Sequence, residues 1–382
     1  MLHFSRDEFD ARRDRLMLEM GEQKLDALML FAQESMYWLT GYDTFGFCHF
    51  QCLVVKADGE MQLLTRSADL RQARHTSTLE SISIWRDRGS ADPVIELRDM
   101  LDDMGLLGAR IGVEWATHGL TAANGQMVQE RLGSFATLKE ASNLVPLLRA
   151  VKTPAEIETV REAARLGDEA FDAALPLIRA GANEADILAA LQGEVLRQGG
   201  DYPANPFIVG SGRDALLCRY KSGRRILDDQ DQLTLEWAGV KSQYHAALMK
   251  TVIVGRPSER HVELHTAARE ALDVVEAAMV PGSSFGDVFD AHAAVMEAHE
   301  LVRHRLSACG YSLGARYAPS WMDTPMFYSG NPQPIVPDMT LFAHMIIMDS
   351  DTDTAMTLGR TYLTTTSAPE PLSRLSLDLI SV

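Results

Sequence analysis

The segment Leu233–Thr251, LTLEWAGVKSQYHAALMKT, is the most informative stretch of this chain. Apolar residues occupy positions 233, 235 and 237, and Thr234 and Glu236 stand between them. Alternation with a period of two predicts a β-strand that carries Thr234 and Glu236 on one face. A carboxylate in such an apolar strand has either a buried partner or a chemical role. Glu236 is therefore the first candidate site residue, and an ion pair with Lys250 or Arg219 is the competing structural interpretation.

The composition is that of a globular protein with two domains. The chain has 382 residues, of which 46% are hydrophobic and 23% charged, and 382 residues exceed the usual size of one domain. Its net charge of −17 argues against nucleic acid or an anionic membrane as a partner. Four cysteines without a CxxC pair indicate reduced thiols in the cytoplasm. Neither a signal peptide nor an apolar run of membrane-spanning length is visible.

Strand and helix patterns alternate over the first 148 residues. Alternation of this kind predicts a small α/β domain. The Asp58-Gly59 pair predicts the turn of a hairpin over Gln51–Leu64. The remaining candidates are strands at Leu25–Phe31, Ser81–Trp85 and Ala109–Glu114 and a helix at Pro93–Met104.

A new pattern begins at residue 149. Thr153 and Pro154 suit the N-cap and first turn of a helix that continues to about Ile178. Helix pairs and strands then alternate, which predicts an α+β domain over residues 149–382. The expected helices are Glu184–Gln198, Pro257–Met279 and Ser284–His299, and the expected strands include Thr340–Met348, Ala355–Leu358 and Thr361–Thr366.

Several motifs together resemble the creatinase/aminopeptidase P/prolidase family, the pita-bread hydrolases. They are RAVKTPAEIE (149–158), EWAG (236–239), YHAALMKTV (244–252) and GYSLGARYAPSW (310–321). The resemblance implies a creatinase-like α/β domain over 1–148, a pita-bread domain over 149–382 and a homodimer. In that dimer the partner subunit's N-terminal domain closes the cleft through the segment Trp38–Cys52. The last three of these motifs, together with WLTGYD (38–43), QCLVV (51–55) and GGDYPA (199–204), also resemble ectoine hydrolase within the family.

The positions of the family's metal ligands are altered in this chain. Metal-dependent members place two Asp, a His and two Glu at five positions, where this chain has Glu236, Ala247, Tyr311, His344 and Gly359. A pair of divalent ions needs several anionic oxygens to offset its charge. Ala and Gly supply no ligand atom, so we expect no metal and no other cofactor.

The metal-free members of the family hydrolyse small zwitterions. An amidinium or guanidinium carbon is already electrophilic, whereas a neutral amide must be polarised by a metal. Such a site needs an anion for the cation, a base for water and an acid for the leaving nitrogen. We expect Glu236 to hold the cation or activate water and His245 or His344 to move a proton. A structural role in the core is the alternative for both histidines.

The expected substrate-binding residues surround this centre. By the resemblance, Arg219 aligns with a catalytic or substrate-binding histidine of the family, but arginine stays protonated and cannot act as a base at pH 7. We therefore expect Arg219 to bind a substrate carboxylate. Tyr244 and His245 point to opposite faces of a strand, so one of them reaches the site. The other candidates are Tyr311, Tyr317, Trp321 and Trp38.

The sequence thus predicts a metal-independent hydrolase of a non-peptide C–N bond in a small zwitterion, similar to ectoine hydrolase. Three alternatives stay open. They are a metal-dependent Xaa-Pro dipeptidase, a creatinase-like amidinohydrolase and a non-catalytic protein that binds a zwitterion.

Overall fold

The computed structural model describes residues 1–89, 91–219 and 223–382. The chain folds into two compact units, Met1–Arg149 and Ala150–Val382. The division falls in helix α6 (Leu144–Ala150), and the boundary predicted after residue 148 lies in the same helix. Across the described ranges, no helix is both long and apolar enough to cross a membrane.

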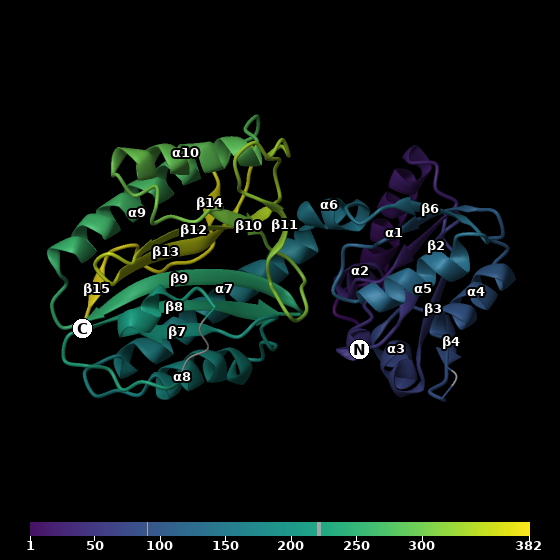
Figure 1. Ribbon diagram of the computed structural model, residues 1–382, viewed down its shortest axis with the longest axis horizontal. Helices are drawn as coiled ribbons and strands as arrows, with labels where there is room; N and C mark the ends of the chain where they lie inside the picture. The colour runs from purple at the N-terminus through teal and green to yellow at the C-terminus, as the bar shows by residue number, and fades with distance from the viewer. Residues whose placement is uncertain (90, 220–222) are drawn as a thin grey trace. The chain divides into compact units, whose positions relative to one another are not determined.

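The first unit is built on a six-stranded sheet of order β4-β3-β2-β1-β5-β6, with helices packed on it (Figure 1). The predicted hairpin is confirmed, because β2 and β3 pair antiparallel across a turn in which Gly59 has φ +90°. Its strands are β1 (Ala27–Leu30), β2 (Cys52–Lys56), β3 (Met61–Arg66), β4 (Ser81–Trp85), β5 (Arg110–Val113) and β6 (Thr137–Glu140). Its helices are α1 (Arg6–Glu22), α2 (Gln33–Thr40), α3 (Leu70–Thr76), α4 (Pro93–Asp103) and α5 (Ala122–Leu132), with short 3-10 turns η1 (Gly46–Cys48) and η2 (Ser67–Asp69).

The second unit contains a nine-stranded sheet whose main path is β11-β10-β12-β13-β9-β8-β7. The main strands are β7 (Ile208–Ser211), β8 (Asp231–Lys241), β9 (Tyr244–Val254), β10 (Gly310–Ser312), β11 (Asp323–Met326), β12 (Thr340–Asp349) and β13 (Thr354–Leu363). Two short strands, β14 (Glu370–Pro371) and β15 (Ile380–Ser381), pair with β13 and β9. The helices are α7 (Pro154–Ala174), α8 (Glu184–Arg197), α9 (Glu259–Ala278) and α10 (Phe285–Ala298), with 3-10 turns η3 (Leu175–Leu177) and η4 (Gly212–Leu216).

Both helix pairs pack on the same face of this sheet. Trp237 on β8 donates its indole N–H to the carbonyl of Gly167 in α7 at 2.8 Å. Leu358 on β13 belongs to the apolar core beneath α9 and α10. Lys250 lies opposite Leu358 in the ladder, and residues two apart on one strand share a face, so these side chains all point toward the helices. Figure 1 shows α7 and α8 beside β7–β9 and α9 and α10 beside β12 and β13.

Two predicted elements differ from the structure. The expected strands at 355–358 and 361–366 are one continuous strand, β13, because Gly359 and Arg360 keep their ladder pairing with β12. The helix predicted to reach residue 178 ends at Ala174 and passes into the 3-10 turn η3. Pro176 lies in that turn and has no N–H for a further α-helical hydrogen bond.

Candidate functional site

The candidate site lies on the sheet face opposite the helices. In the ladder Glu236 is opposite Met249, Met249 is opposite Gly359, and Gly359 is opposite His344. These four residues therefore form one row across β8, β9, β13 and β12.

The adjacent row lies two residues further along these strands. It contains Ala247 on β9, opposite Ala238, and Tyr311 on β10, opposite Phe342. All five positions that align with metal ligands of the family thus lie in two neighbouring rows of one face.

Glu236 is a buried carboxylate, with 6% of its surface exposed. Within the described ranges it has no hydrogen-bond or ion-pair partner. Burial raises the pKa of Glu236 to about 7, and the positive charge of Arg219 opposes this shift. Near neutral pH the carboxyl group is therefore partly protonated and can both accept and release a proton.

Tyr311 and Trp321 form a buried pair. The indole N–H of Trp321 donates to the hydroxyl oxygen of Tyr311 at 2.9 Å. The Tyr311 ring lies 5.5 Å from the rings of both Phe342 and His344. Burial and the charge of Glu236 raise the pKa of Tyr311 well above its ordinary value, so its hydroxyl keeps its proton.

His245 and His344 are both held neutral. Burial lowers the pKa of His245 to about 4 and that of His344 to about 3. The Nε2 atom of His245 accepts the backbone N–H of Ala204 at 3.0 Å. The Nδ1 atom of His344 is buried without a hydrogen-bond partner in the part of the chain that the structure describes. At neutral pH neither imidazole has a second proton to donate as an acid.

Arg219 is exposed beside the site. It donates to the carbonyl of Cys218 at 3.0 Å, and its second terminal nitrogen lies 3.9 Å from the sulfur of Met322. Its charge lowers the pKa of Glu236, which places the guanidinium within electrostatic range of the carboxylate. An exposed cation near a buried anion fits the two charges of a zwitterion.

Tyr244, Trp38 and Tyr317 are the remaining predicted residues, and all three are buried. The hydroxyl of Tyr244 donates to Glu156 at the start of α7, so Tyr244 points toward the helices while His245 points the other way. Trp38 lies in the core of the first unit, 5.7 Å from the guanidinium of Arg12. Tyr317 is buried in the second unit.

The residues of the two rows do not fit a two-metal centre. Ala247 and Gly359 carry no ligand atom. A Cβ atom at Gly359 would lie 2.9 Å from the carbonyl oxygen of Ala343 and 3.0 Å from the ring of Phe342. Phe342 therefore fills the space that a carboxylate at residue 359 would need.

One group of three potential metal donors occurs elsewhere among the described residues: His304, Asp349 and Asp351. Asp349 is already ion-paired with Arg260 at 2.7 Å, and Asp351 is paired with Arg303. These arginines supply the positive charge that a metal ion would bring, so the group is explained as an ion-pair cluster.

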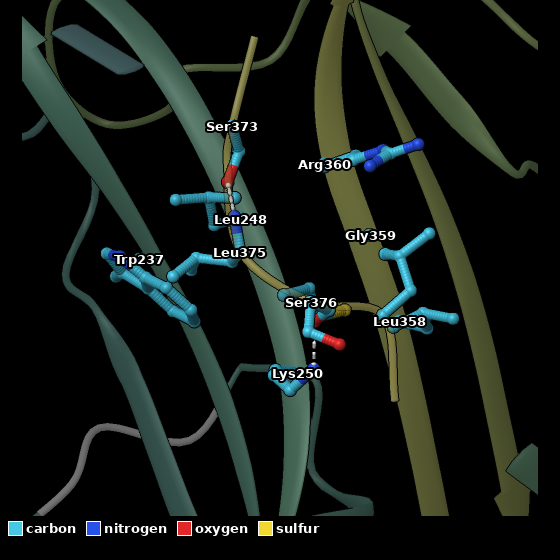
Figure 2. Close-up of a pocket in the computed structure, with 11 residues that line it drawn as sticks. Trp237, Leu248, Lys250, Leu358, Gly359, Arg360, Ser373, Leu375 and Ser376 are labelled. Atoms are coloured by element: carbon cyan, nitrogen blue, oxygen red, sulfur yellow. Dashed lines mark hydrogen bonds between the residues drawn. The ribbon is translucent and has the colours of Figure 1, made fainter. Parts of the chain in front are cut away.

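A small cavity lies behind the sheet, on the helix side. Figure 2 shows the amine of Lys250 donating to the carbonyl of Ser376, with Trp237, Leu358 and Arg360 around the cavity. Burial lowers the pKa of Lys250 to about 8. The C-terminal segment closes this cavity, which is on the other face from the Glu236 carboxylate.

Sequence reasoning missed two residues beside the site. Met249 occupies the row between Glu236 and Gly359, and its place two residues after Ala247 is the signal that could have found it. The side chain of Asn205, which directly follows the GGDYPA motif, accepts the backbone N–H of Trp321 at 3.0 Å.

Two family models match the chain. Residues 158–366 match metallopeptidase family M24, and residues 12–151 match the creatinase/prolidase N-terminal domain. The chain belongs to family M24. The predicted family and the two-domain pita-bread fold are therefore confirmed.

Known relatives in the family differ in what they act on. The chain is 27% identical to the ectoine hydrolase of Halomonas elongata over 358 residues, 89% of each chain. It is 20% identical to the Xaa-Pro dipeptidase of Pyrococcus furiosus over 303 residues, 79% of this chain and 82% of that one. The solved prolidase of Thermococcus sibiricus has a TM-score of 0.87 at 15% identity, covering 98% of this chain and 99% of that one. These relatives support a hydrolase of family M24.

Proposed function

We propose that this protein is a metal-independent hydrolase that opens a non-peptide C–N bond of a small zwitterion, with ectoine as the first substrate to test. One observation carries the proposal. The two rows keep a single carboxylate, Glu236, at the five aligned positions, and Phe342 fills the space beside Gly359. The similarity to ectoine hydrolase over 89% of the chain supports the same choice.

The charges of the site match a substrate whose reacting carbon is already electrophilic. A cyclic amidinium has an electrophilic carbon, so no metal is required to polarise it. In the proposal Glu236 stabilises this cation and takes a proton from the attacking water. Arg219 binds the carboxylate of the substrate, and Tyr311 donates a hydrogen bond at the reacting centre.

The test is ring opening of ectoine by the purified protein, followed by NMR with and without EDTA. We expect turnover that EDTA does not reduce and less than stoichiometric metal in the protein. Glu236→Gln should lower kcat by about 10²-fold or more, the usual contribution of a general base. Glu158→Gln changes an exposed carboxylate at the start of α7 and is the matched control. Full turnover by Glu236→Gln would contradict the assigned role.

The second candidate function is an Xaa-Pro dipeptidase. It is favoured by the prolidases among the similar structures and by the Pyrococcus furiosus dipeptidase. Manganese- or cobalt-stimulated cleavage of an Xaa-Pro dipeptide, together with stoichiometric bound metal, would establish it. Release of urea from creatine would indicate an amidinohydrolase, and calorimetric binding of ectoine without product would indicate a binding protein.

We also propose a homodimer in which the segment Trp38–Cys52 contributes to the partner subunit's site. Phe45, in this segment, is 85% exposed. The proposal rests on the family resemblance, and the ring of Phe45 offers apolar surface for a partner subunit to cover.

A further inference from the structure

We infer that Trp321 is a positioning residue that directs the hydroxyl proton of Tyr311 toward the space in front of Glu236. The chemical consequence rests on the proposed function, because it assigns Tyr311 as the donor to the reacting oxygen. The arrangement itself can be tested in the protein without substrate.

The direction of one hydrogen bond decides where the Tyr311 proton goes. An indole N–H can only donate, so the 2.9 Å contact makes Tyr311 the acceptor and Trp321 the donor. A tyrosine hydroxyl has one proton, and this contact does not use it. Both side chains are almost completely buried, at 3% and 1% exposure, where an unused donor is costly.

Glu236 is the acceptor that we assign to this proton. Its side chain shares the sheet face of Tyr311, and its charge acts on the Tyr311 hydroxyl. In the described part of the chain, no hydrogen bond joins the two groups or gives either Glu236 oxygen a donor. This face thus holds a buried donor and a buried acceptor that are not paired with each other. A ligand that donates to Glu236 and accepts from Tyr311 would satisfy both groups.

Trp321 is itself held in place at its backbone. Its N–H donates to the side chain of Asn205 at 3.0 Å, and the neighbouring Ala204 N–H donates to Nε2 of His245 at 3.0 Å. The backbone N–H of His245 donates to the carbonyl of Gly314 at 3.2 Å. His245 therefore acts as a neutral acceptor that fixes the loop at 204–205. This assigns His245 a positioning role in place of the predicted proton transfer.

The proposed reaction uses the Tyr311 proton as a hydrogen bond, without transferring it. Water forms a C–O bond to the amidinium carbon, and Glu236 takes the released proton. A ring C–N bond then breaks and its electron pair goes to nitrogen, which receives the proton from Glu236. The hydroxyl on carbon loses its proton to the amine, so the products are an amide and an ammonium. Tyr311 stabilises the oxygen while it changes from hydroxyl to carbonyl.

The test is the titration of Glu236, followed by NMR in protein labelled with ¹³C at the glutamate carboxyl carbons. Glu236→Gln assigns the signal. If the Tyr311 proton points toward Glu236, its dipole stabilises the carboxylate. Tyr311→Phe and Trp321→Phe should then raise the pKa of Glu236 by roughly half a unit, the equivalent of a weak hydrogen bond. Tyr362→Phe is the matched control, because Tyr362 is equally buried but packs in the core beneath α9 and α10.

An unchanged Glu236 titration in Tyr311→Phe would overturn the inference, and this near-isosteric variant decides the matter even if Trp321→Phe does not fold. A second readout is the indole ¹H–¹⁵N signal of Trp321, which should move upfield in Tyr311→Phe and stay in place in Tyr362→Phe. With ectoine, the variants at 311 and 321 should lower kcat more than they change KM. The double variant should be no slower than Tyr311→Phe alone. Absence of wild-type turnover would count against the proposed function, while the titration would still decide this inference.

Discussion

At the scale of single residues, Glu236 and Glu114 share a raised pKa and differ in their surroundings. Burial raises the pKa of each to about 7. The oxygens of Glu114 accept the backbone N–H groups of Phe31 and Ala32 and the hydroxyl of Ser35, at 3.0, 2.8 and 2.6 Å. Glu236 has no such donor within the described ranges. Hydrogen bonds within the fold therefore explain why the Glu114 carboxylate is buried. Among the described residues, no such contact explains the burial of Glu236.

This contrast predicts that the two Glu→Gln substitutions change the free energy of unfolding differently. The folded-state pKa of Glu236 exceeds the ordinary value of 4.5, so the folded protein binds more protons than the unfolded chain between about pH 4.5 and 7. The stability contributed by neutral Glu236 is thus present below pH 4.5 and lost as the pH rises through 7. Glu236→Gln should raise the free energy of unfolding by about 1–3 kcal/mol at pH 8 and change it little at pH 4.5.

Glu114→Gln is the comparison for that prediction. Its amide places a donor opposite other donors, which should cost about 1–3 kcal/mol at pH 4.5. The pKa of Glu114 is raised like that of Glu236, so the loss should be smaller at pH 8, where the wild-type carboxylate is ionised. Denaturant unfolding followed by tryptophan fluorescence at pH 4.5 and pH 8 measures both variants. Equal effects of the two substitutions would show that the buried Glu236 carboxylate does not lower the free energy of unfolding more than Glu114 does.

At the scale of elements, adjacent side chains of β9 point to opposite faces of the sheet and have different roles. Tyr244 donates to Glu156, whose carboxylate also completes the capping box at the start of α7. We expect Tyr244→Phe to lower the free energy of unfolding by about 1–2 kcal/mol, the cost of losing a buried hydrogen bond to a carboxylate. The KM and kcat for substrate should stay within about twofold, since Tyr244 faces the helices. A large rise in KM would restore the predicted substrate-binding role.

The loop before β8 depends on one buried carboxylate at the start of α8. Glu184 accepts from the backbone and hydroxyl of Ser211 and from the backbone N–H groups of residues 223–225. Glu184→Ala should cost about 2–4 kcal/mol, because several buried donors lose their acceptor. Glu184→Gln keeps one acceptor oxygen and should lower the free energy of unfolding less than Glu184→Ala. Thermal unfolding by calorimetry measures both, and similar melting temperatures for wild type and Glu184→Ala would contradict this role.

The elements also show what the sequence could predict. Period-two alternation placed Glu236 on one strand face, and Thr153-Pro154 marked the start of α7, because both signals are local. The partner of Tyr244 is Glu156, 88 residues away, and the donor to Tyr311 is Trp321 across a turn. Such partners depend on strand register and side-chain direction, which no local pattern contains. The same limit explains the break predicted at Gly359, where cross-strand pairing maintains β13.

At the scale of the whole molecule, the proposed homodimer makes the first unit part of the site of a second copy. The expected mass in light scattering is twice 42.2 kDa, or 84.4 kDa. Phe45→Asp places a charge on the most exposed aromatic side chain of the segment Trp38–Cys52 and should lower the dimer fraction or the turnover of substrate. Leu18→Asp is the matched control, since Leu18 is 73% exposed on α1 of the same unit and lies outside this segment. A monomeric wild type, or equal effects of the two substitutions, would contradict a specific contribution of this segment.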